Sequence, residues 1–388
     1  MKKSYKRFFE LDAIRGFAIC GIFMVNIVYF AYPAEKLSEV FAPSLYWYSN
    51  VLNFIKDDII GGRTATIFAF LFGLGMGMQW NKWRNFSFLL RRNLVLALIG
   101  LLHIVLLFHG DILLDYALFG LIGTILLRFV KKQSFFLFLG VAIALYSFVL
   151  MILQHHGWVS RGSYTSNLKI GLDEKILLFQ EGGFLEQCWF RIRYYLSIRQ
   201  MPWVRNFYFP PVMACYVFGL YATKTKFLSN FTNKRLYKKI LSFTIVYKIA
   251  IVVLGFSIVS NTFKETLGYR LLMYIDQFST SLLLVSVIVL ACQYGFGKSI
   301  LKPLTVLGKA SLSSYILQSV TASILFFSIG FGQYNLLSLG QVQLFMLFFT
   351  VLIYLFNKVC LRYLEQGLLE KMWRKLAISP NTRESFNT

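Results

Sequence analysis

Residues 11–30 read LDAIRGFAICGIFMVNIVYF, an apolar stretch that also carries Asp12, Arg15 and Asn26. About 20 apolar residues allow a helix to cross a bilayer, so this stretch is long enough to be a transmembrane helix. Ionisable and amide side chains are costly in hydrocarbon and usually face a site or another helix. The stretch therefore predicts both a membrane fold and a helix face with a function.

The composition of the whole chain also indicates a membrane protein. The 388 residues are 57% hydrophobic and 15% charged, which is more apolar surface than one soluble core buries. The net charge of +23 comes from Lys and Arg between apolar segments, without the aromatic-interleaved basic domain of nucleic-acid binding proteins. We expect membrane lipids, including anionic headgroups, as partners and no nucleic acid. The five cysteines occur singly, so neither disulfides nor a metal site are expected.

Apolar windows recur along the chain and predict an all-α polytopic membrane protein with about ten transmembrane helices. The basic start MKKSYKRF resembles a signal peptide, but the first window is long and lacks a small-residue cleavage site, so we expect a retained span. The windows are 11–30, 61–79, 93–109, 112–130, 134–153, 207–223, 239–260, 271–294, 310–330 and 340–358.

The connecting segments alternate in basicity. Lys and Arg concentrate at the N-terminus, after the second, fourth, sixth and eighth windows, and in the tail. The positive-inside rule then places both termini in the cytoplasm. We interpret residues 1–388 as a single integral membrane domain. Its parts are helices one to five (11–153), an extracytoplasmic loop (154–206), helices six to ten (207–358) and a basic cytoplasmic tail (359–388).

The loop at 154–206 is longer than the other predicted connections. It contains FLEQCWFRIRYYLSIRQ, an amphipathic stretch that we expect to form a helix at the membrane interface. Two interpretations stay open: a surface linker between two groups of five helices, or a lid over an outward-facing site.

The polar residues of the first window share one helix face. Arg15 and Asn26 are eleven positions apart, about three turns, and therefore lie roughly 16 Å apart along the axis. Asp12 and Arg15 lie near the inner boundary, where they can pair with each other. Asn26 lies toward the outer boundary, where it bonds a neighbouring helix or faces a site.

The third and fourth windows supply candidate acid–base groups. His103 lies deep in apolar sequence, and His109, Asp111 and Asp115 follow at the outer end. An imidazole can take or give a proton near neutral pH, and a carboxylate such as Asp111 would orient it and stabilise its charged form. A hydrogen-bonded core histidine is the alternative interpretation. His109 and Asp115 are secondary candidates.

Arg63 lies at the outer end of the second window. It can bind an anionic acceptor or headgroup, or simply extend to the interface as basic residues near helix ends do. Gly73 and Gly77 in the same window have the small-xxx-small spacing that permits close helix packing.

A polar stripe opens the ninth window. Ser311, Ser314 and Gln318 recur on one helix face, with Tyr315 beside them. Such a stripe either bonds a neighbouring helix or lines a pocket, and the sequence favours neither.

Four segments resemble the YeiB family of bacterial membrane proteins, a domain of unknown function: LDAIRGFAICGIFMVN, IFAFLFGLGMG, GLLHIVLLFHGDILLDYALFG and GKASLSSYILQS. That family is similar to a transmembrane acyltransferase superfamily, which includes the family-3 acyltransferases and the lysosomal heparan-alpha-glucosaminide N-acetyltransferase. In the family-3 enzymes a first-span Arg is followed eleven residues later by a catalytic His. Here that spacing joins Arg15 to Asn26, as in the lysosomal group.

The resemblance implies a membrane acyltransferase that uses cytoplasmic acyl-CoA, with acetyl-CoA as the first donor to consider. The acceptor is a hydroxyl or amine of an extracytoplasmic glycan, lipid or small molecule. The implied roles are His103 as base, Asp111 as its orienting carboxylate, Asn26 at the oxyanion, Arg15 and Arg63 at anionic groups, and Ser314, Tyr315 and Gln318 along the path. The chain departs from the family at Ala65, where a second basic residue is usual, and its GLLEKMWRKL only loosely matches the family ending Gly-Pro-Leu-Glu-x-x-Trp-Arg.

Other classes of function stay open on the residues alone. A small-solute transporter is the main alternative, because scattered polar groups on many spans suit it equally. A non-catalytic membrane scaffold or sensor is the third, and a homodimer is compatible with each of them.

Overall fold

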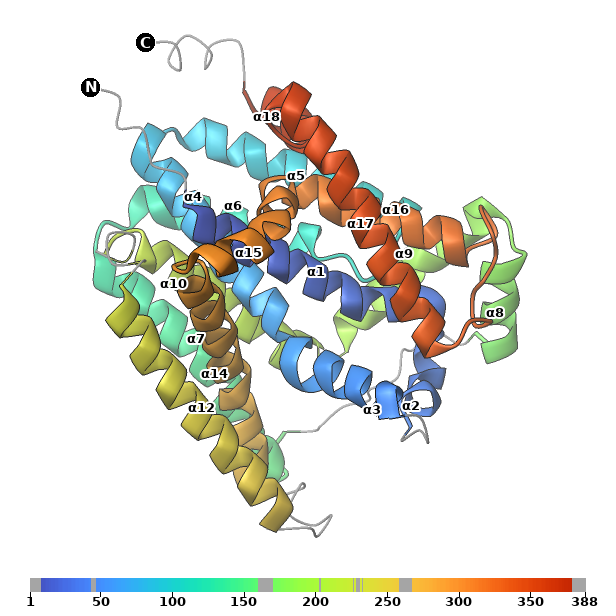
Figure 1. The fold of residues 1–388 in the computed structure, drawn as a ribbon, viewed down its shortest axis with the longest axis horizontal. Helices are drawn as coiled ribbons and strands as arrows, with labels where there is room; N and C mark the ends of the chain where they lie inside the picture. The colour runs from blue at the N-terminus through green and yellow to red at the C-terminus, as the bar shows by residue number, and fades with distance from the viewer. Residues whose placement is uncertain are drawn as a thin grey trace.

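The chain folds as a helical bundle (Figure 1), seen in a computed structural model that describes residues 8–42, 47–159, 170–201, 204–225, 227, 231, 233–257 and 267–378. Within these ranges every regular element is a helix, and no strand occurs. Each of the ten predicted windows overlaps one helix. These are α1 (Phe9–Ala31), α4 (Arg63–Trp83), α5 (Phe86–Leu106), α6 (Leu113–Phe129), α7 (Gln133–His155), α10 (Phe209–Ala222), α12 (Lys234–Ser257), α14 (Leu267–Ala291), α16 (Ser311–Phe326) and α17 (Leu339–Leu364).

Six helices of the described chain are long and apolar enough to cross a membrane: α1, α4, α5, α7, α14 and α17. Helices α6, α10 and α16 have only 17, 14 and 16 residues. At 1.5 Å per residue they span about 21–26 Å, less than the ~30 Å of a hydrocarbon core. The sequence windows were longer because apolar loop residues extend them. α10 packs against α4 and α7, so protein surrounds much of it.

The outward faces of the long helices are apolar. Large hydrophobic side chains are exposed along α7 and α17, where a water-soluble protein would carry polar residues. Such a surface can contact lipid chains, because its side chains are apolar and the backbone groups of a helix are hydrogen-bonded to one another. The exposed residues on these two helices include Phe138, Leu145, Val149, Leu344, Leu347, Val351 and Leu355. The structure is that of a membrane protein.

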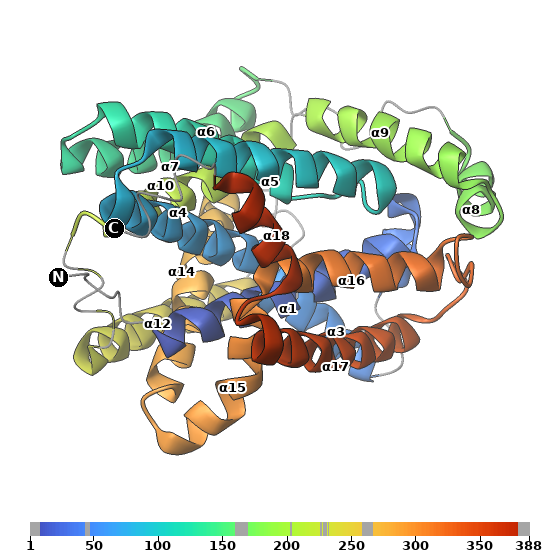
Figure 2. The same cartoon turned by 90° about the horizontal axis from the view of Figure 1, so that it is seen from above.

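Shorter elements join the long helices. Between α1 and α4 lie η1 (Ala34–Lys36), α2 (Leu37–Val40), α3 (Trp47–Phe54) and η2 (Ile55–Ile60), and α15 (Gly295–Lys309) and α18 (Leu368–Ala377) lie in the last third of the chain. The predicted loop 154–206 contains α8 (Leu172–Gln180), α9 (Phe184–Gln200) and η3 (Val204–Tyr208). The helix predicted over FLEQCWFRIRYYLSIRQ is confirmed as α9, but it has no clean apolar face toward the bundle, because Gln187 and Arg191 are buried while Leu185 and Trp189 are exposed. Figure 2 shows α8 and α9 at the right-hand end of the bundle.

Helices α8 and α9 are bonded to both halves of the chain. The Lys175 ammonium lies 3.0 Å from the Glu35 carboxylate, and the Gln187 amide donates a 2.7 Å hydrogen bond to Ser328. Burial lowers the pKa of Lys175, and the charge of Glu35 opposes that shift. These contacts fix the segment against the bundle.

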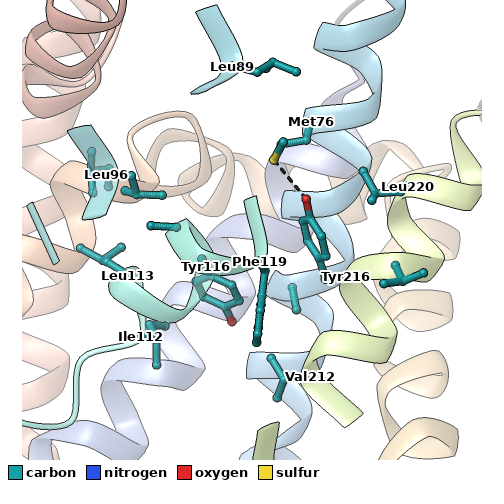
Figure 3. Packing of buried hydrophobic residues seen from close by; sticks show 14 of the residues in the cluster. Met76, Leu89, Leu96, Ile112, Leu113, Tyr116, Phe119, Val212, Tyr216 and Leu220 are labelled. Atoms are coloured by element: carbon teal, nitrogen blue, oxygen red, sulfur yellow. Dashed lines mark hydrogen bonds between the residues drawn. The ribbon is translucent and has the colours of Figure 1, made fainter. Parts of the chain in front are cut away.

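The central core forms where α4, α6 and α10 meet (Figure 3). The Tyr216 hydroxyl donates to the sulfur of Met76 at 3.2 Å, and the Tyr116 hydroxyl donates to the Ala65 carbonyl at 3.0 Å. A Cβ on Gly73 would overlap the Tyr216 carbonyl oxygen, and one on Gly77 would overlap Thr223. The packing role predicted for these two glycines is confirmed, because α4 and α10 could not otherwise approach so closely.

Helices α1 and α15 touch through a reciprocal pair of glycines. A Cβ on Gly16 would overlap the Leu304 carbonyl oxygen, and a Cβ on Gly308 would overlap the Asp12 carbonyl oxygen. This backbone-to-backbone contact places Arg15, next to Gly16, and Lys309, next to Gly308, on the wall of the same cavity.

We expect Gly16→Ala to destabilise the protein by about 1–3 kcal/mol, because the added methyl group forces α1 away from α15. Thermal unfolding of the purified protein in detergent measures the loss. Gly268→Ala on α14 is the control, because a Cβ there meets nothing within 4 Å. Alanine is the better helix former by about 1 kcal/mol, so the control is expected to be neutral or stabilising. Equal losses at the two positions would contradict the packing argument.

Candidate functional site

His103 lies in the last turn of α5, with its side chain completely buried. Its Nδ1 atom lies 2.8 Å from Oδ1 of Asp111, and its Nε2 atom lies 2.8 Å from the hydroxyl oxygen of Ser319 on α16. The structure therefore brings together the histidine and carboxylate that the sequence paired, and it adds a serine. The order of groups is carboxylate, imidazole, hydroxyl.

Asp111 is held by the start of α6. Its second carboxylate oxygen, Oδ2, accepts a 2.8 Å hydrogen bond from the Leu114 amide. The first amide groups of a helix lack partners within the helix, and the helix dipole favours a negative charge beside them. One oxygen of Asp111 thus binds the helix end while the other faces His103.

Ser319 is a site residue that the sequence analysis missed. With the proton on Nδ1, which faces the carboxylate, Nε2 can accept the Ser319 O–H, and that hydroxyl also lies 3.4 Å from the Tyr315 carbonyl oxygen. This arrangement activates a hydroxyl in serine hydrolases on unrelated folds. Ser319 follows Tyr315 by one helical turn, so the polar stripe of the ninth window held a signal. The pattern of the stripe did not indicate which serine of this window contacts His103.

A cavity of about 240 Å³, which we call the cationic cavity, lies among α1, α4, α5, α15, α16 and α18. Three cationic side chains line it: Arg15, Arg92 and Lys309. Arg15 lies 3.3 Å from Asp12, so the predicted pair of these two residues is confirmed. Nη1 of Arg92 is buried and has no hydrogen-bond partner in the described chain. The cavity therefore carries excess positive charge, which suits an anionic ligand.

Helix α18 forms one wall of the cationic cavity. The Trp373 indole donates a 2.7 Å hydrogen bond to the Arg92 carbonyl, and the Arg92 guanidinium lies 4.1 Å from the Trp373 ring centroid. The Glu370 carboxylate accepts from the Leu312 amide at 2.7 Å and from the Ser313 hydroxyl at 2.5 Å. Burial raises the pKa of Glu370, and these hydrogen bonds oppose the shift. Residues 368–377 of the predicted tail thus pack against the bundle, while residues 379–388 lie outside the described chain.

A second cavity, of about 250 Å³, is lined by Asn26, and we call it the Asn26 cavity. Asp111 lines it, and Ile112 lines both this cavity and the cationic one. The Asn26 amide makes no hydrogen bond to the described part of the chain and is half-buried at the cavity wall. His109 also lines it, with its ring packed edge-on against Tyr194 at 4.6 Å between centroids. Ile112 therefore lies between the Asn26 cavity and the cationic cavity.

Asp115 carries a partner that the sequence did not indicate. Nη1 and Nη2 of Arg199, on α9, lie 2.7 Å and 3.0 Å from its two carboxylate oxygens. Nη2 of Arg199 also donates to the Asp111 carbonyl at 3.3 Å. This two-point contact attaches α9 beside the Asn26 cavity, which Arg199 and Tyr194 help to line.

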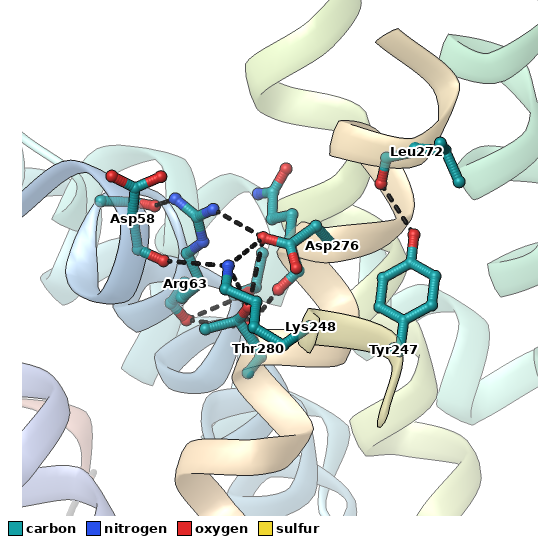
Figure 4. Close-up of polar contacts among 11 residues, drawn as sticks. Asp58, Arg63, Tyr247, Lys248, Leu272, Asp276 and Thr280 are labelled. Atoms are coloured by element: carbon teal, nitrogen blue, oxygen red, sulfur yellow. Dashed lines mark hydrogen bonds and ion pairs between the residues drawn. The ribbon is translucent and has the colours of Figure 1, made fainter. Parts of the chain in front are cut away.

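Arg63 lies apart from His103. Its guanidinium donates to Asp276 on α14 at 3.1 Å and to the Gly61 carbonyl at 2.8 Å. Lys248 of α12 lies 2.7 Å from the same oxygen of Asp276 (Figure 4). Arg63 lines a third cavity, of about 460 Å³, together with Lys56. Asp276, which the sequence did not indicate, pairs with both Arg63 and Lys248.

The polar stripe of α16 divides between two roles. Ser311 and Tyr315 line the cationic cavity. Ser314 accepts a 3.0 Å hydrogen bond from Asn357 of α17, and the Gln318 amide donates to the Ile19 carbonyl at 3.4 Å. Ser314 and Gln318 thus join helices.

His103 itself lines neither cavity. The cationic cavity ends at Ile112 and at Tyr315, whose ring centroid lies 5.0 Å from that of the imidazole. The Asn26 cavity reaches Asp111, the partner of His103. A ligand in the cationic cavity therefore reaches His103 only after Tyr315 or Ile112 moves.

We expect Arg199→Gln to lower the free energy of unfolding by about 1–3 kcal/mol, because the Asp115 carboxylate is left buried without its cation. Asp115→Asn combined with Arg199→Gln should cost less than the sum of the two single changes. Thermal unfolding of the four proteins gives the coupling energy. Arg235→Gln, an exposed cation on α12, is the control. Strictly additive losses would show that the pair contributes no coupling.

Comparisons with known proteins find relatives whose names state no activity. Residues 222–380 match the family described as "Protein of unknown function (DUF418)". The chain is 26% identical to "Uncharacterized protein YxaH" of Bacillus subtilis (strain 168), over 94% of this chain and 92% of that protein. It is 37% identical to "Uncharacterized protein YeiB" of Escherichia coli (strain K12), over 30% of each chain. No solved structure matches it. The matches support the YeiB-like family that the motifs resemble.

Proposed function

We propose that the protein is a membrane acyltransferase, which moves an acyl group from cytoplasmic acyl-CoA to a hydroxyl or amine acceptor on the other side of the membrane. The observation that carries the proposal is the buried chain of Asp111, His103 and Ser319 beside the wall between two cavities. Acyl transfer needs a base, a place for an anionic donor and a separate approach for the acceptor. The described residues offer all three within one region.

The proposed orientation is ten spans with both termini in the cytoplasm of a bacterium, so the cationic cavity opens inward. Contacts among the basic helix ends support it. Lys224, after α10, donates to the Val130 carbonyl at the end of α6 at 3.1 Å, and Asn81 of α4 donates to the Thr223 carbonyl at 3.2 Å. The ends that the positive-inside rule assigns to the cytoplasm therefore gather on one side of the bundle.

The cationic cavity suits the donor. Arg15, Arg92 and Lys309 provide three positive charges, and guanidinium groups bind phosphate oxygens through paired hydrogen bonds. The volume of about 240 Å³ is below that of most small-molecule pockets. We therefore place the phosphates of acyl-CoA at these three cations, with the pantetheine arm and acyl group inside the cavity and the rest of the nucleotide at the cytoplasmic mouth. Acetyl-CoA is the first donor to test, because a small acyl group needs the least space.

The proposed reaction is attack of the acceptor oxygen or nitrogen on the thioester carbonyl carbon. His103 takes the acceptor proton through the Ser319 hydroxyl, and Asp111 stabilises the imidazolium. The carbon–sulfur bond then breaks, and the leaving CoA thiolate takes the proton from His103. The Asn26 amide donates to the developing oxyanion. Donor binding must displace Tyr315 or Ile112, which separate the cavities from His103.

Helix α9 favours the lid interpretation of residues 154–206 within this proposal. It places Tyr194, Ile198 and Arg199 on the wall of the Asn26 cavity, where the acceptor would enter. A segment that only linked two helix groups would not need the two-point contact of Arg199 with Asp115.

Transport of a small solute is the alternative, because two cavities separated by one side chain also suit alternating access. Transporters typically bind their solute between broken helices near the membrane midplane. In the described chain the long helices α1, α4, α5, α7, α14 and α17 are each continuous. The carboxylate–imidazole–hydroxyl chain favours the enzyme.

We expect the purified protein to hydrolyse acetyl-CoA slowly when no acceptor is present. His103→Gln and Ser319→Ala should each lower that rate about 100-fold or more, because each change removes one of the two groups through which the proton is taken up. Ser323→Ala is the matched control on the same helix, since its hydroxyl bonds the Leu107 carbonyl at 3.4 Å. A thiol-release assay measures the rates. A rate that survives His103→Gln would exclude His103 as the base.

Donor binding is tested separately. We expect acetyl-CoA to raise the unfolding temperature, and Arg92→Gln to weaken the apparent Kd about 10-fold, as expected for loss of a charged hydrogen bond. Arg235→Gln, which removes the same charge from an exposed position, should leave the Kd unchanged. If acyl-CoA gives no thermal shift at millimolar concentration, the acyltransferase proposal fails and transport becomes the leading function.

A further inference from the structure

Helix α18 has three different faces. At 100° per residue, Leu369, Glu370, Trp373 and Ala377 fall on one side, which packs against the bundle. Leu368, Met372 and Leu376 form a second stripe at i, i+4 and i+8, and they are 42%, 53% and 62% exposed. The cations Lys371, Arg374 and Lys375 occupy the third side and are also exposed. Among the residues that the structure describes, the bundle packs against the first face and leaves the side chains of the other two exposed.

The position of α18 suggests what covers the other two faces. The helix begins four residues after the end of α17, one of the candidate membrane-spanning helices. Glu365 between them has a φ of 61°, a left-handed conformation that ends α17 and turns the chain. Tyr363, at the end of α17, is 73% exposed, and tyrosines are enriched at the membrane–water interface. α18 therefore starts at the level of the lipid headgroups.

We infer that α18 is a membrane-surface helix that binds anionic phospholipid through Lys371, Arg374 and Lys375. Its apolar stripe inserts at the boundary between headgroups and acyl chains, as in other amphipathic helices with a basic polar face. The charge argues for an anionic lipid, because basic clusters next to a transmembrane helix are attracted to acidic headgroups. This inference does not depend on the acyltransferase proposal.

Lipid binding at α18 has a consequence for the cationic cavity. The inward face of the helix contributes Glu370 and Trp373 to the wall of that cavity. Glu370 accepts from two amides at the start of α16, so the position of α18 is coupled to the helix that carries Ser319. A lipid that holds the outer faces of α18 therefore also stabilises this wall.

The test uses the full-length protein in nanodiscs of phosphatidylcholine, alone or with phosphatidylglycerol at about one-third of the lipid. Hydrogen–deuterium exchange of the amides in residues 368–378 is the readout. We expect exchange to be several-fold slower with phosphatidylglycerol. The triple variant K371Q/R374Q/K375Q should lose this dependence on lipid charge while exchange in phosphatidylcholine stays unchanged.

The matched control is R235Q/K238Q/K239Q, which removes the same charge from exposed positions at the start of α12. It should keep the full effect of phosphatidylglycerol. M372Q/L376Q should exchange faster in both lipids, because the apolar stripe no longer inserts. Unchanged exchange in α7 shows that each variant is folded. Equal exchange of the wild-type helix in the two lipids, or a lipid effect that survives K371Q/R374Q/K375Q, overturns the inference.

Discussion

The buried carboxylate of Asp111 is the group on which the arrangement of the site depends. A charge in an apolar interior is tolerated only when it is paired and hydrogen-bonded. One oxygen of Asp111 accepts a hydrogen bond from the start of α6, and the other lies 2.8 Å from Nδ1 of His103. That double contact sets the imidazole orientation, and the orientation directs its second nitrogen toward Ser319. α5, α6 and α16 are thereby tied together at one point.

Each of the two cavities is lined in part by a helix outside the predicted membrane spans. α9 reaches the Asn26 cavity through Arg199 and Asp115, and α18 reaches the cationic cavity through Glu370 and the amides of α16. Both attachments join a charged side chain to a helix start or an opposite charge. Such contacts are directional, so the helices are positioned by polar bonds as well as by apolar packing.

Much of the fold and part of the site could be predicted from the sequence. Apolar windows located the helices, amphipathic spacing located α9, and local spacing paired Asp12 with Arg15 and His103 with Asp111. The site residues that the sequence did not indicate have one property in common. Each lies beside a residue that is distant in the sequence. Ser319 meets His103, Arg199 meets Asp115, Asp276 meets Arg63, and Arg92 and Lys309 meet Arg15 across one cavity.

The sequence by itself determined that this is a helical membrane protein with polar groups on particular helix faces, because hydropathy and helical periodicity are local properties. Only the tertiary structure decided which faces meet. Arg15 and Lys309 line one cavity because Gly16 and Gly308 let α1 and α15 touch, and Arg92 reaches the same cavity from α5. Ser314 and Gln318 join helices while Tyr315 lines a cavity, although all three lie on one short stretch of α16. The roles of these three residues differ because the side chains of α16 point toward several neighbouring helices.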